Sequence, residues 1–337
     1  VEDSVDVRLA YGRDQSQVIR NLINNDFTPQ TGIPVNLKLV TGGTLLPSIL
    51  AGKGPDSYIG IGQGDVINYA IRGAILPLED FEGFEEATKP FNEAAMMVLG
   101  IADANGDYHT YGLPETQTFN MMFYRTDVLK SLGLKPPQTW QDLYNCITVI
   151  QRQNMNIGIP TTADMFSTML FQRGGTYFVD DYSAVNFNTN EAIDAFRQWT
   201  EFNTKYSMPL AYDPLNRFRA GEYPIIVTNY TFYNNLAVGA PEIKGLWEMT
   251  AIPGIMQEDG TINRSQPCEG LVSVMIKDCD NKNQVYDFMT WWVSANTQAE
   301  FGNKIEARLG IGGRYTTANT EAFKRLSWST VEQQEIL

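Results

Sequence analysis

The sequence predicts an α/β fold with two domains, and three observations support this prediction. The chain has 337 residues, which is enough for two domains of ordinary size. Apolar residues make up 43% of it and charged residues 19%, as in globular proteins. Strand-like and helix-like segments alternate over the first 72 residues, which is typical of a largely parallel sheet covered by helices on both faces.

The alternation is built from six elements. Polar and apolar residues alternate in the first strand, the strand at 57–61 is a short run typical of a buried strand, and the helices repeat apolar residues with helical spacing. Gly32 ends the first helix, and Gly42-Gly43 turns the chain into the second. We expect, in order, a strand at 5–11, a helix at 15–27, a strand at 33–40, a helix at 45–50, a strand at 57–61 and a helix at 66–72.

Beyond residue 72, the Asn105-Gly106 pair is the strongest hairpin signal in the chain. The surrounding Asp103–Asp107 stretch hints at a calcium loop, but its glycine stands at the fourth position instead of the sixth, which favours the hairpin. Thr139 is a good N-cap for the helix after it. Further elements are expected as strands at 119–125, 223–227 and 271–276 and helices at 127–132, 141–153, 188–206 and 281–302.

Charge and composition exclude several classes of function. The net charge is −14 and no dense Lys/Arg cluster occurs, which argues against nucleic-acid binding. No apolar run approaches the roughly 20 residues that span a bilayer. The three cysteines are too scattered for a zinc site; Cys268 and Cys279 could pair, although buried thiols are favoured. We therefore expect no metal. We also expect no cofactor, because the glycines at 60–64 depart from dinucleotide-binding spacing.

Five ordered segments resemble one known family. The segments are Phe27–Val35; Leu50–Asp56 with Gly73–Leu78; Tyr111–Pro114 with Phe123–Leu129; Pro137–Leu143; and Phe218–Glu222. In this order they resemble the family 1 extracellular solute-binding proteins of ABC importers, which are maltose-binding-protein-like. The resemblance covers nearly the whole chain.

The resemblance implies a two-lobed periplasmic-binding-protein fold of type II. Each lobe would be a mostly parallel sheet flanked by helices, and crossing hinge strands would join the two. We expect residues 1–113 plus 273–313 in the first lobe and residues 114–272 plus 314–337 in the second. Family members usually continue beyond the segment that resembles 308–337, so we expect the second lobe to be truncated here.

The same resemblance implies a function without catalysis. The protein would be extracytoplasmic, as a surface lipoprotein or in the periplasm, and would capture a sugar or short oligosaccharide as a monomer for an ABC permease. No signal peptide precedes Val1, so the sequence begins after processing or comes from a longer chain. A polyamine or an oxyanion is the alternative ligand. A carbohydrate-active enzyme is the least favoured alternative, since His109 is the only histidine and no G-x-S-x-G motif occurs.

The candidate ligand contacts follow strands or lie where the chain would cross between lobes. Loops at the carboxyl ends of parallel strands present such groups, and sugars need polar side chains with exposed aromatic rings. Asp14 and Thr44 could instead be helix caps, and Phe166 is a core residue more readily than a stacking ring. Tyr230 is the best candidate for a stacking platform. The full set is Arg13, Asp14, Thr44, Gln63, Asp65, Gln117, Thr118, Asn120, Asn229, Tyr230, Glu269 and Arg314.

Overall fold

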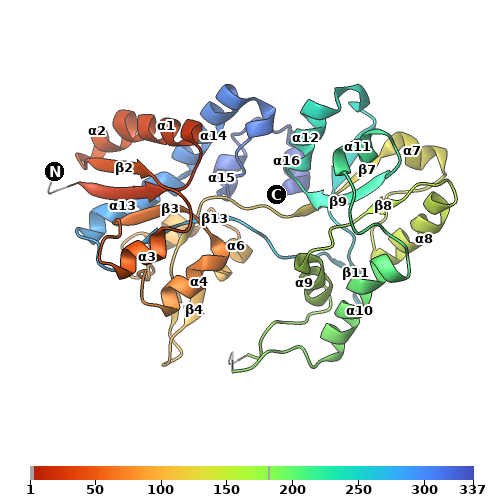
Figure 1. Cartoon of the computed structure of the whole chain (residues 1–337), viewed down its shortest axis with the longest axis horizontal. Helices are drawn as coiled ribbons and strands as arrows, with labels where there is room; N and C mark the ends of the chain where they lie inside the picture. Colours follow the sequence, from red (N-terminus) through yellow and green to blue (C-terminus); the bar gives the residue numbers. More distant parts are fainter. Residues whose placement is uncertain (1–3, 181–182) are drawn as a thin grey trace. The chain divides into compact units, whose positions relative to one another are not determined.

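The computed structural model describes residues 4–180 and 183–337 (Figure 1). The chain forms two compact units. Unit 1 comprises residues 1–118 and 268–329, and unit 2 comprises residues 119–267 and 330–337. Within the described ranges, none of the helices combines the length and apolar character needed to cross a membrane.

Unit 1 is an α/β unit assembled from both ends of the chain. Its elements are β1 (Val5–Leu9), α1 (Arg13–Leu22), the π-helical turn η1 (Ile23–Phe27), α2 (Thr28–Thr31), β2 (Val35–Leu39), α3 (Leu45–Leu50), β3 (Ser57–Gly62), α4 (Gln63–Ile71), α5 (Phe84–Thr88), α6 (Glu93–Met97), β4 (Gly100–Ala102), β5 (Tyr108–Thr110), β6 (Leu113–Pro114), β13 (Leu271–Met275), α13 (Lys282–Val293), α14 (Ala295–Leu309), the 3-10 turn η3 (Ile311–Gly313) and α15 (Thr320–Phe323).

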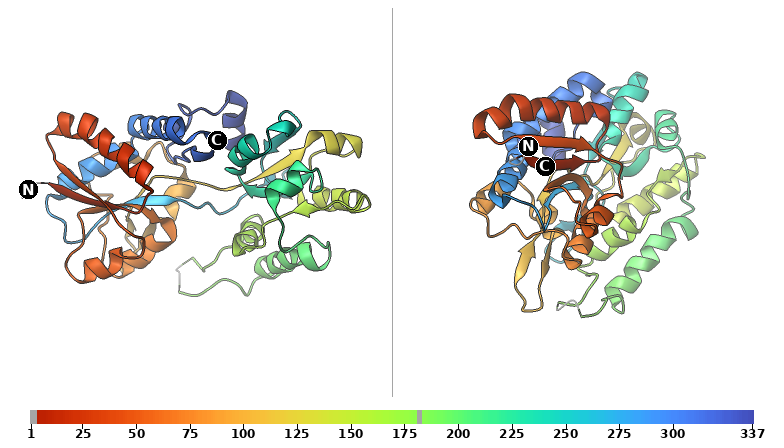
Figure 2. Two further views of the ribbon diagram at one scale, coloured as in Figure 1. Left: turned by 45° about the horizontal axis from the view of Figure 1, so that its top comes forward. Right: turned by 60° about the vertical axis from the view of Figure 1, so that its left-hand side comes forward.

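The sheet of unit 1 has the strand order β2-β1-β3-β13-β6. β1 lies parallel to β2 and β3, as the β-α-β-α-β pattern predicts. Its inward positions Val5, Val7 and Leu9 are buried and alternate with half-buried residues. Helices α1, α13 and α14 lie on one face of the sheet, and α3 and α4 lie on the other (Figure 2). Their apolar side chains form a core on each face. This burial on both faces confirms the sheet predicted for the first 72 residues.

Unit 2 is built around a smaller sheet. Its elements are β7 (Asn120–Arg125), α7 (Thr126–Ser131), α8 (Trp140–Gln151), β8 (Ile157–Gly158), α9 (Ala163–Phe171), α10 (Asn190–Thr204), α11 (Pro214–Arg219), β9 (Ile225–Asn229), α12 (Phe232–Gly239), the 3-10 turn η2 (Pro241–Ile243), β10 (Trp247–Thr250), β11 (Ile255–Met256), β12 (Ile262–Asn263) and α16 (Thr330–Ile336).

The strand order in unit 2 is β10-β7-β9-β8, and this sheet is mixed. β7 runs antiparallel to both of its neighbours, and only β8 and β9 are parallel. The second sheet therefore differs from the mostly parallel one expected. Sequence periodicity marks where a strand lies and which residues face inward, but it does not give the direction in which neighbouring strands run.

The boundaries also differ from the expected ones. Residues 314–329, expected in the second lobe, belong to unit 1, where Tyr315 and Ala318 join its apolar core. The single helix expected at 281–302 is two helices, α13 and α14. Ser294 has an extended backbone between them, and its side chain accepts a hydrogen bond from the amide of Thr297 as the N-cap of α14.

Candidate functional site

Five chain segments meet at one edge of the sheet in unit 1, which we call the carboxyl edge. The parallel strands β1, β2 and β3 all end there. β13 begins there, because it runs antiparallel to β3 and pairs Leu271 with Gly62. β6 is antiparallel to β13 and so ends there too. The predicted residues on these segments are Arg13, Asp14, Thr44, Gln63, Asp65, Gln117, Thr118 and Glu269.

Gln63 is fixed at the carboxyl edge by the segment that precedes β13. Its backbone N–H donates to the carbonyl of Gly270 at 3.0 Å, and its side-chain Nε2 donates to the carbonyl of Cys268 at 2.5 Å. A side chain at Gly270 would place a Cβ 2.1 Å from the Thr116 carbonyl oxygen. Only glycine therefore allows this close approach.

Two exposed carboxylates, Asp65 and Glu269, lie on segments of the same edge. Asp65 is in the first turn of α4, where the helix dipole favours a negative charge. Glu269 pairs with Thr118 through two backbone hydrogen bonds of 2.7 and 2.9 Å, in an isolated antiparallel bridge. This bridge holds two predicted contacts side by side next to Gln63.

Beneath the carboxyl edge lies a buried carboxylate, Glu115, which sequence reasoning left out of the candidate set. Glu115 has no exposed surface, and it accepts hydrogen bonds from the Tyr11 hydroxyl at 3.0 Å, the Gly60 amide at 2.7 Å and Trp292 Nε1 at 2.7 Å. Burial raises the pKa of Glu115, and these donors offset part of that effect. Glu115 thus joins β1, β3, β6 and α13.

One signal could have found Glu115. It opens the polar, strand-like segment 115–118, and a buried polar segment is costly unless its groups are bonded. The sequence therefore shows that this polar segment needs hydrogen-bond partners. It does not show which residues supply them, because the donors Tyr11, Gly60 and Trp292 are remote along the chain.

Two residues of unit 1 that were predicted to contact a ligand, Gln117 and Arg314, bond to other side chains of the protein. Gln117 is 9% exposed; its Oε1 accepts a hydrogen bond from Asn92 at 3.3 Å. The side chain of Arg314 is 8% exposed; it pairs with Glu306 at 3.1 Å and lies over the ring of Trp328, 4.6 Å from its centroid. The structure gives Arg314 these partners inside unit 1, and its contact with a ligand stays a prediction.

The loops after β1 and β2 hold the other predicted residues of unit 1. Arg13 and Asp14 are exposed in the first turn of α1. Asp14 pairs with Arg308 at 3.4 Å instead of capping the helix, whose N-cap is Gly12. Thr44 is at the N-cap position of α3, but its hydroxyl donates to the Thr41 carbonyl at 2.9 Å and caps nothing.

In unit 2, Asn120 and Asn229 pair across neighbouring strands. They are in register where β7 begins and β9 ends. Gln266 brackets the backbone of Asn120 with bonds of 2.9 and 2.8 Å to its N–H and carbonyl. Asn229 Oδ1 accepts from the amide and hydroxyl of Thr231 at 3.0 and 2.9 Å. Two amide side chains thus mark one edge of this sheet.

Tyr230 differs from its predicted role as a stacking platform. It is 1% exposed, and its ring packs against Phe119 with centroids 5.2 Å apart. A stacking platform needs an open ring face, which this burial removes. Phe166 is a packing residue as well, in ring contact with Phe187, Phe196 and Trp199.

Acids and amides dominate the chemistry of the candidate residues. Over residues 4–180 and 183–337, no group of three or more His, Cys, Asp and Glu side chains is arranged to hold a metal ion. The three cysteines are free thiols, so Cys268 and Cys279 do not pair. Carboxylates accept hydrogen bonds, and side-chain amides both donate and accept them. The arrangement is suited to hydroxyl-rich or cationic ligands.

Comparisons with known proteins agree with this fold. The sequence model of the bacterial extracellular solute-binding proteins matches residues 23–324. A lactose-binding protein of Rhizobium radiobacter is 20% identical over 273 residues. That match covers 77% of this chain and spans 64% of the relative's length.

Two solved structures illustrate the likeness. The cyclic alpha-maltosyl-1,6-maltose binding protein of Arthrobacter globiformis gives a TM-score of 0.75 at 17% identity, covering 99% of this chain and 85% of the other. The sugar-binding protein MalE of Xanthomonas citri gives 0.75 at 18% identity, covering 95% and 84%. These similarities confirm the predicted α/β fold class of periplasmic binding proteins.

Proposed function

This chain belongs to the bacterial extracellular solute-binding proteins, and from that premise we propose that it captures a carbohydrate, either a sugar or a short oligosaccharide. The observation that best supports this proposal is the carboxyl edge of unit 1, where Gln63, Asp65 and Glu269 lie on neighbouring segments. The relatives named above bind lactose and a cyclic maltosyl-maltose according to their descriptions.

The chemistry of the carboxyl edge supports this ligand class. A sugar hydroxyl donates one hydrogen bond and accepts others, so carboxylates with amides satisfy it on both counts. Gln63 is held in place by hydrogen bonds to Gly270 and Cys268. Its side chain therefore loses little further conformational entropy when a ligand binds.

The wider function follows the same proposal. We infer that the protein works outside the cytoplasm as a monomer, without chemical turnover, and delivers its ligand to the membrane subunits of an ABC permease. The net charge of −14 adds a reason against nucleic-acid partners, since the field repels polyanions.

A cationic solute such as a polyamine is the second candidate. Asp65 and Glu269 are both exposed at the carboxyl edge, and the exposed Asp14 follows β1 at the same edge. Carboxylates attract ammonium groups directly, whereas they repel an oxyanion. Within this second candidate, the edge therefore favours polyamines over oxyanions.

Isothermal titration calorimetry against mono- and oligosaccharides, spermidine and sulfate tests the proposal. We expect binding to at least one sugar. Asp65→Asn should then weaken affinity about 10-fold or more, because a hydrogen bond to a charged group is worth about 1.5–3 kcal/mol.

The matched control is Asp278→Asn. Asp278 is an exposed carboxylate of unit 1 beyond the far end of β13, at the opposite edge of the sheet, so its loss should leave affinity unchanged. Binding of spermidine or sulfate without any sugar would overturn the carbohydrate proposal. Glycan cleavage by the purified protein would overturn the non-catalytic assignment.

A further inference from the structure

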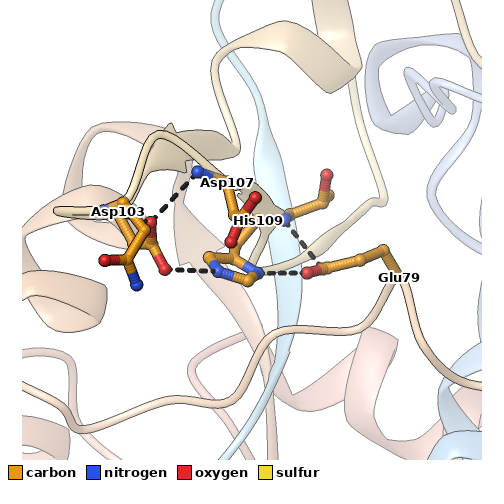
Figure 3. A network of polar contacts seen from close by, with 6 residues as sticks. Glu79, Asp103, Asp107 and His109 are labelled. Carbon is orange, nitrogen blue, oxygen red and sulfur yellow. Dashed lines mark hydrogen bonds and ion pairs between the residues drawn. The ribbon is translucent and has the colours of Figure 1, made fainter.

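A single histidine stands between two carboxylates on the hairpin of unit 1. His109 is the only histidine of the chain and lies on β5, opposite Ile101 of β4. Its Nδ1 contacts Glu79 Oε1, and its Nε2 lies 3.3 Å from Asp103 Oδ2 (Figure 3). Glu79 comes from the segment that follows β3 and α4, whereas Asp103 is in the hairpin turn. The imidazole therefore bridges the hairpin to a separate segment of unit 1.

Backbone amides fix both carboxylates in place. Glu79 Oε2 accepts from the Thr110 amide at 3.0 Å. Asp103 Oδ1 accepts from the amides of Asn105 and Asp107 at 2.8 and 3.0 Å, which closes the turn (Figure 3). In each carboxylate, one oxygen thus accepts from backbone amides and the other oxygen faces the imidazole.

This geometry selects one protonation state. A neutral imidazole carries one N–H, so its other nitrogen would direct a lone pair at a carboxylate oxygen. An imidazolium donates from both nitrogens and satisfies both oxygens. We propose that protonated His109 is a pH-operated clasp that fastens the β4–β5 hairpin to the segment carrying Glu79, and that the clasp opens when the imidazole loses its proton.

Backbone hydrogen bonds next to the clasp show that it would hold the β4–β5 hairpin close to the chain that enters β6. The Leu78 amide donates to the Thr110 carbonyl at 2.8 Å, and the Tyr111 amide donates to the Leu99 carbonyl at 2.9 Å. The chain then enters β6, whose end carries Glu115 and the polar segment 115–118. The hairpin therefore leads directly into the carboxyl edge. The His109 side chain is 27% exposed, so protons exchange freely with solvent.

The electrostatic surroundings agree with this assignment. Glu79 and Asp103 raise the pKa of His109 through hydrogen bonds and charge. The pKa of Glu79 is lowered by His109 and Thr110 against the effect of burial, and that of Asp103 by the turn amides and His109. Tyr111 also faces the ring at 6.3 Å between centroids, and burial and the same two acids raise its pKa. Asp107 contributes its backbone amide.

These directions set the pH window of the clasp. A raised histidine pKa gives stabilisation that is complete below the unfolded value and is lost as pH rises through the folded value. The lowered carboxyl pKa values give stabilisation that is lost only as pH falls through them. The clasp should therefore be closed below the ordinary imidazole pKa of about 6.5 and should open as the pH rises through the raised pKa of His109.

The experiment follows the one histidine by NMR in the full chain. In protein labelled with carbon-13 histidine, the imidazole should titrate with a midpoint above the ordinary value of about 6.5. Amide exchange at Asn105, Asp107 and Thr110 should speed up beyond base catalysis alone as the imidazole deprotonates. Reference amides in β1 supply the intrinsic pH dependence.

Two variants separate the clasp from general effects. Glu79→Gln removes one charge of the clasp and should lower the imidazole midpoint. Asp107→Asn removes a charge from the same turn but keeps the backbone amide, so the midpoint should fall less than in Glu79→Gln. A wild-type midpoint at or below about 6.5 would overturn the proposal, as would hairpin exchange that follows the β1 reference throughout the titration.

Discussion

At the scale of single residues, Glu115 is a buried carboxyl group that needs hydrogen-bond partners inside the protein. Its carboxylate is fully buried yet has no cationic partner among the bonds described for it, which are to Tyr11, Gly60 and Trp292. Three donors converge on two oxygens, and this convergence replaces the hydration that burial removes. Glu115 therefore aligns the loop after β1 with the end of β3 at the carboxyl edge.

Glu115→Gln should destabilise the protein by about 1–3 kcal/mol, because the amide NH2 of glutamine would oppose an N–H or O–H donor and leave it unpaired. Urea denaturation at neutral pH measures the free energy of unfolding. Glu82→Gln is the control, since Glu82 is exposed, and its effect should stay within about 0.5 kcal/mol. Equal effects in both variants would show that the Glu115 network carries no net stability.

Tyr230 and Arg314 show how partners inside the protein limit prediction from single residues. Both have the right chemistry for a ligand contact and follow polar or glycine-rich sequence. In the structure Phe119 packs on Tyr230, and Glu306 with Trp328 holds Arg314. The partners lie on other elements, and nothing in the local sequence distinguishes a ring that faces a ligand from one that faces a neighbour.

At the scale of elements, two threonines begin helices in different ways. Thr139 caps α8 with a full capping box: its hydroxyl accepts from the Asp142 amide, and the Asp142 carboxylate accepts from the Thr139 amide. Thr44 has the same position before α3 without a cap bond. The predicted cap at Thr139 is confirmed, and the one considered for Thr44 is not formed.

Thr139→Ala should lower the free energy of unfolding by about 1 kcal/mol, since the amide of Asp142 in the first turn of α8 loses its partner. Thr44→Ala is the matched control and should change stability by less than about 0.5 kcal/mol. Thermal and urea unfolding of both variants measure the difference. A loss at Thr44 as large as that at Thr139 would contradict the assignment of caps.

At the scale of the whole molecule, ligand binding should appear as stability. If a carbohydrate binds only the folded protein, a concentration 100 times its Kd raises the free energy of unfolding by about 2.7 kcal/mol. Thermal unfolding with and without the sugar found by calorimetry measures this shift. The Asp65→Asn variant at the same sugar concentration should show a smaller one. A sugar that binds by calorimetry without any stabilisation would mean that it binds the unfolded chain equally well.

The sequence by itself determined the local structure and the fold class. The positions of the strands and helices in residues 5–72, the Asn105-Gly106 hairpin and the cap at Thr139 follow from periodicity and turn chemistry within a few residues. Five ordered segments pointed to the solute-binding family, which the match over residues 23–324 confirms. Gln63 and Asp65, placed after the third strand, do lie at the carboxyl edge, and their contact with a ligand remains a prediction.

Only the tertiary structure decided which of these polar and aromatic groups face inward. β13 joins β3 from more than 200 residues away and brings Glu269 and Gly270 to Gln63. Trp292, 177 residues from Glu115 along the chain, donates a hydrogen bond to it, and Trp328 lies against Arg314. The physical reason is that burial and hydrogen-bond satisfaction depend on non-local partners, whereas periodicity and turn chemistry depend on neighbours in the chain.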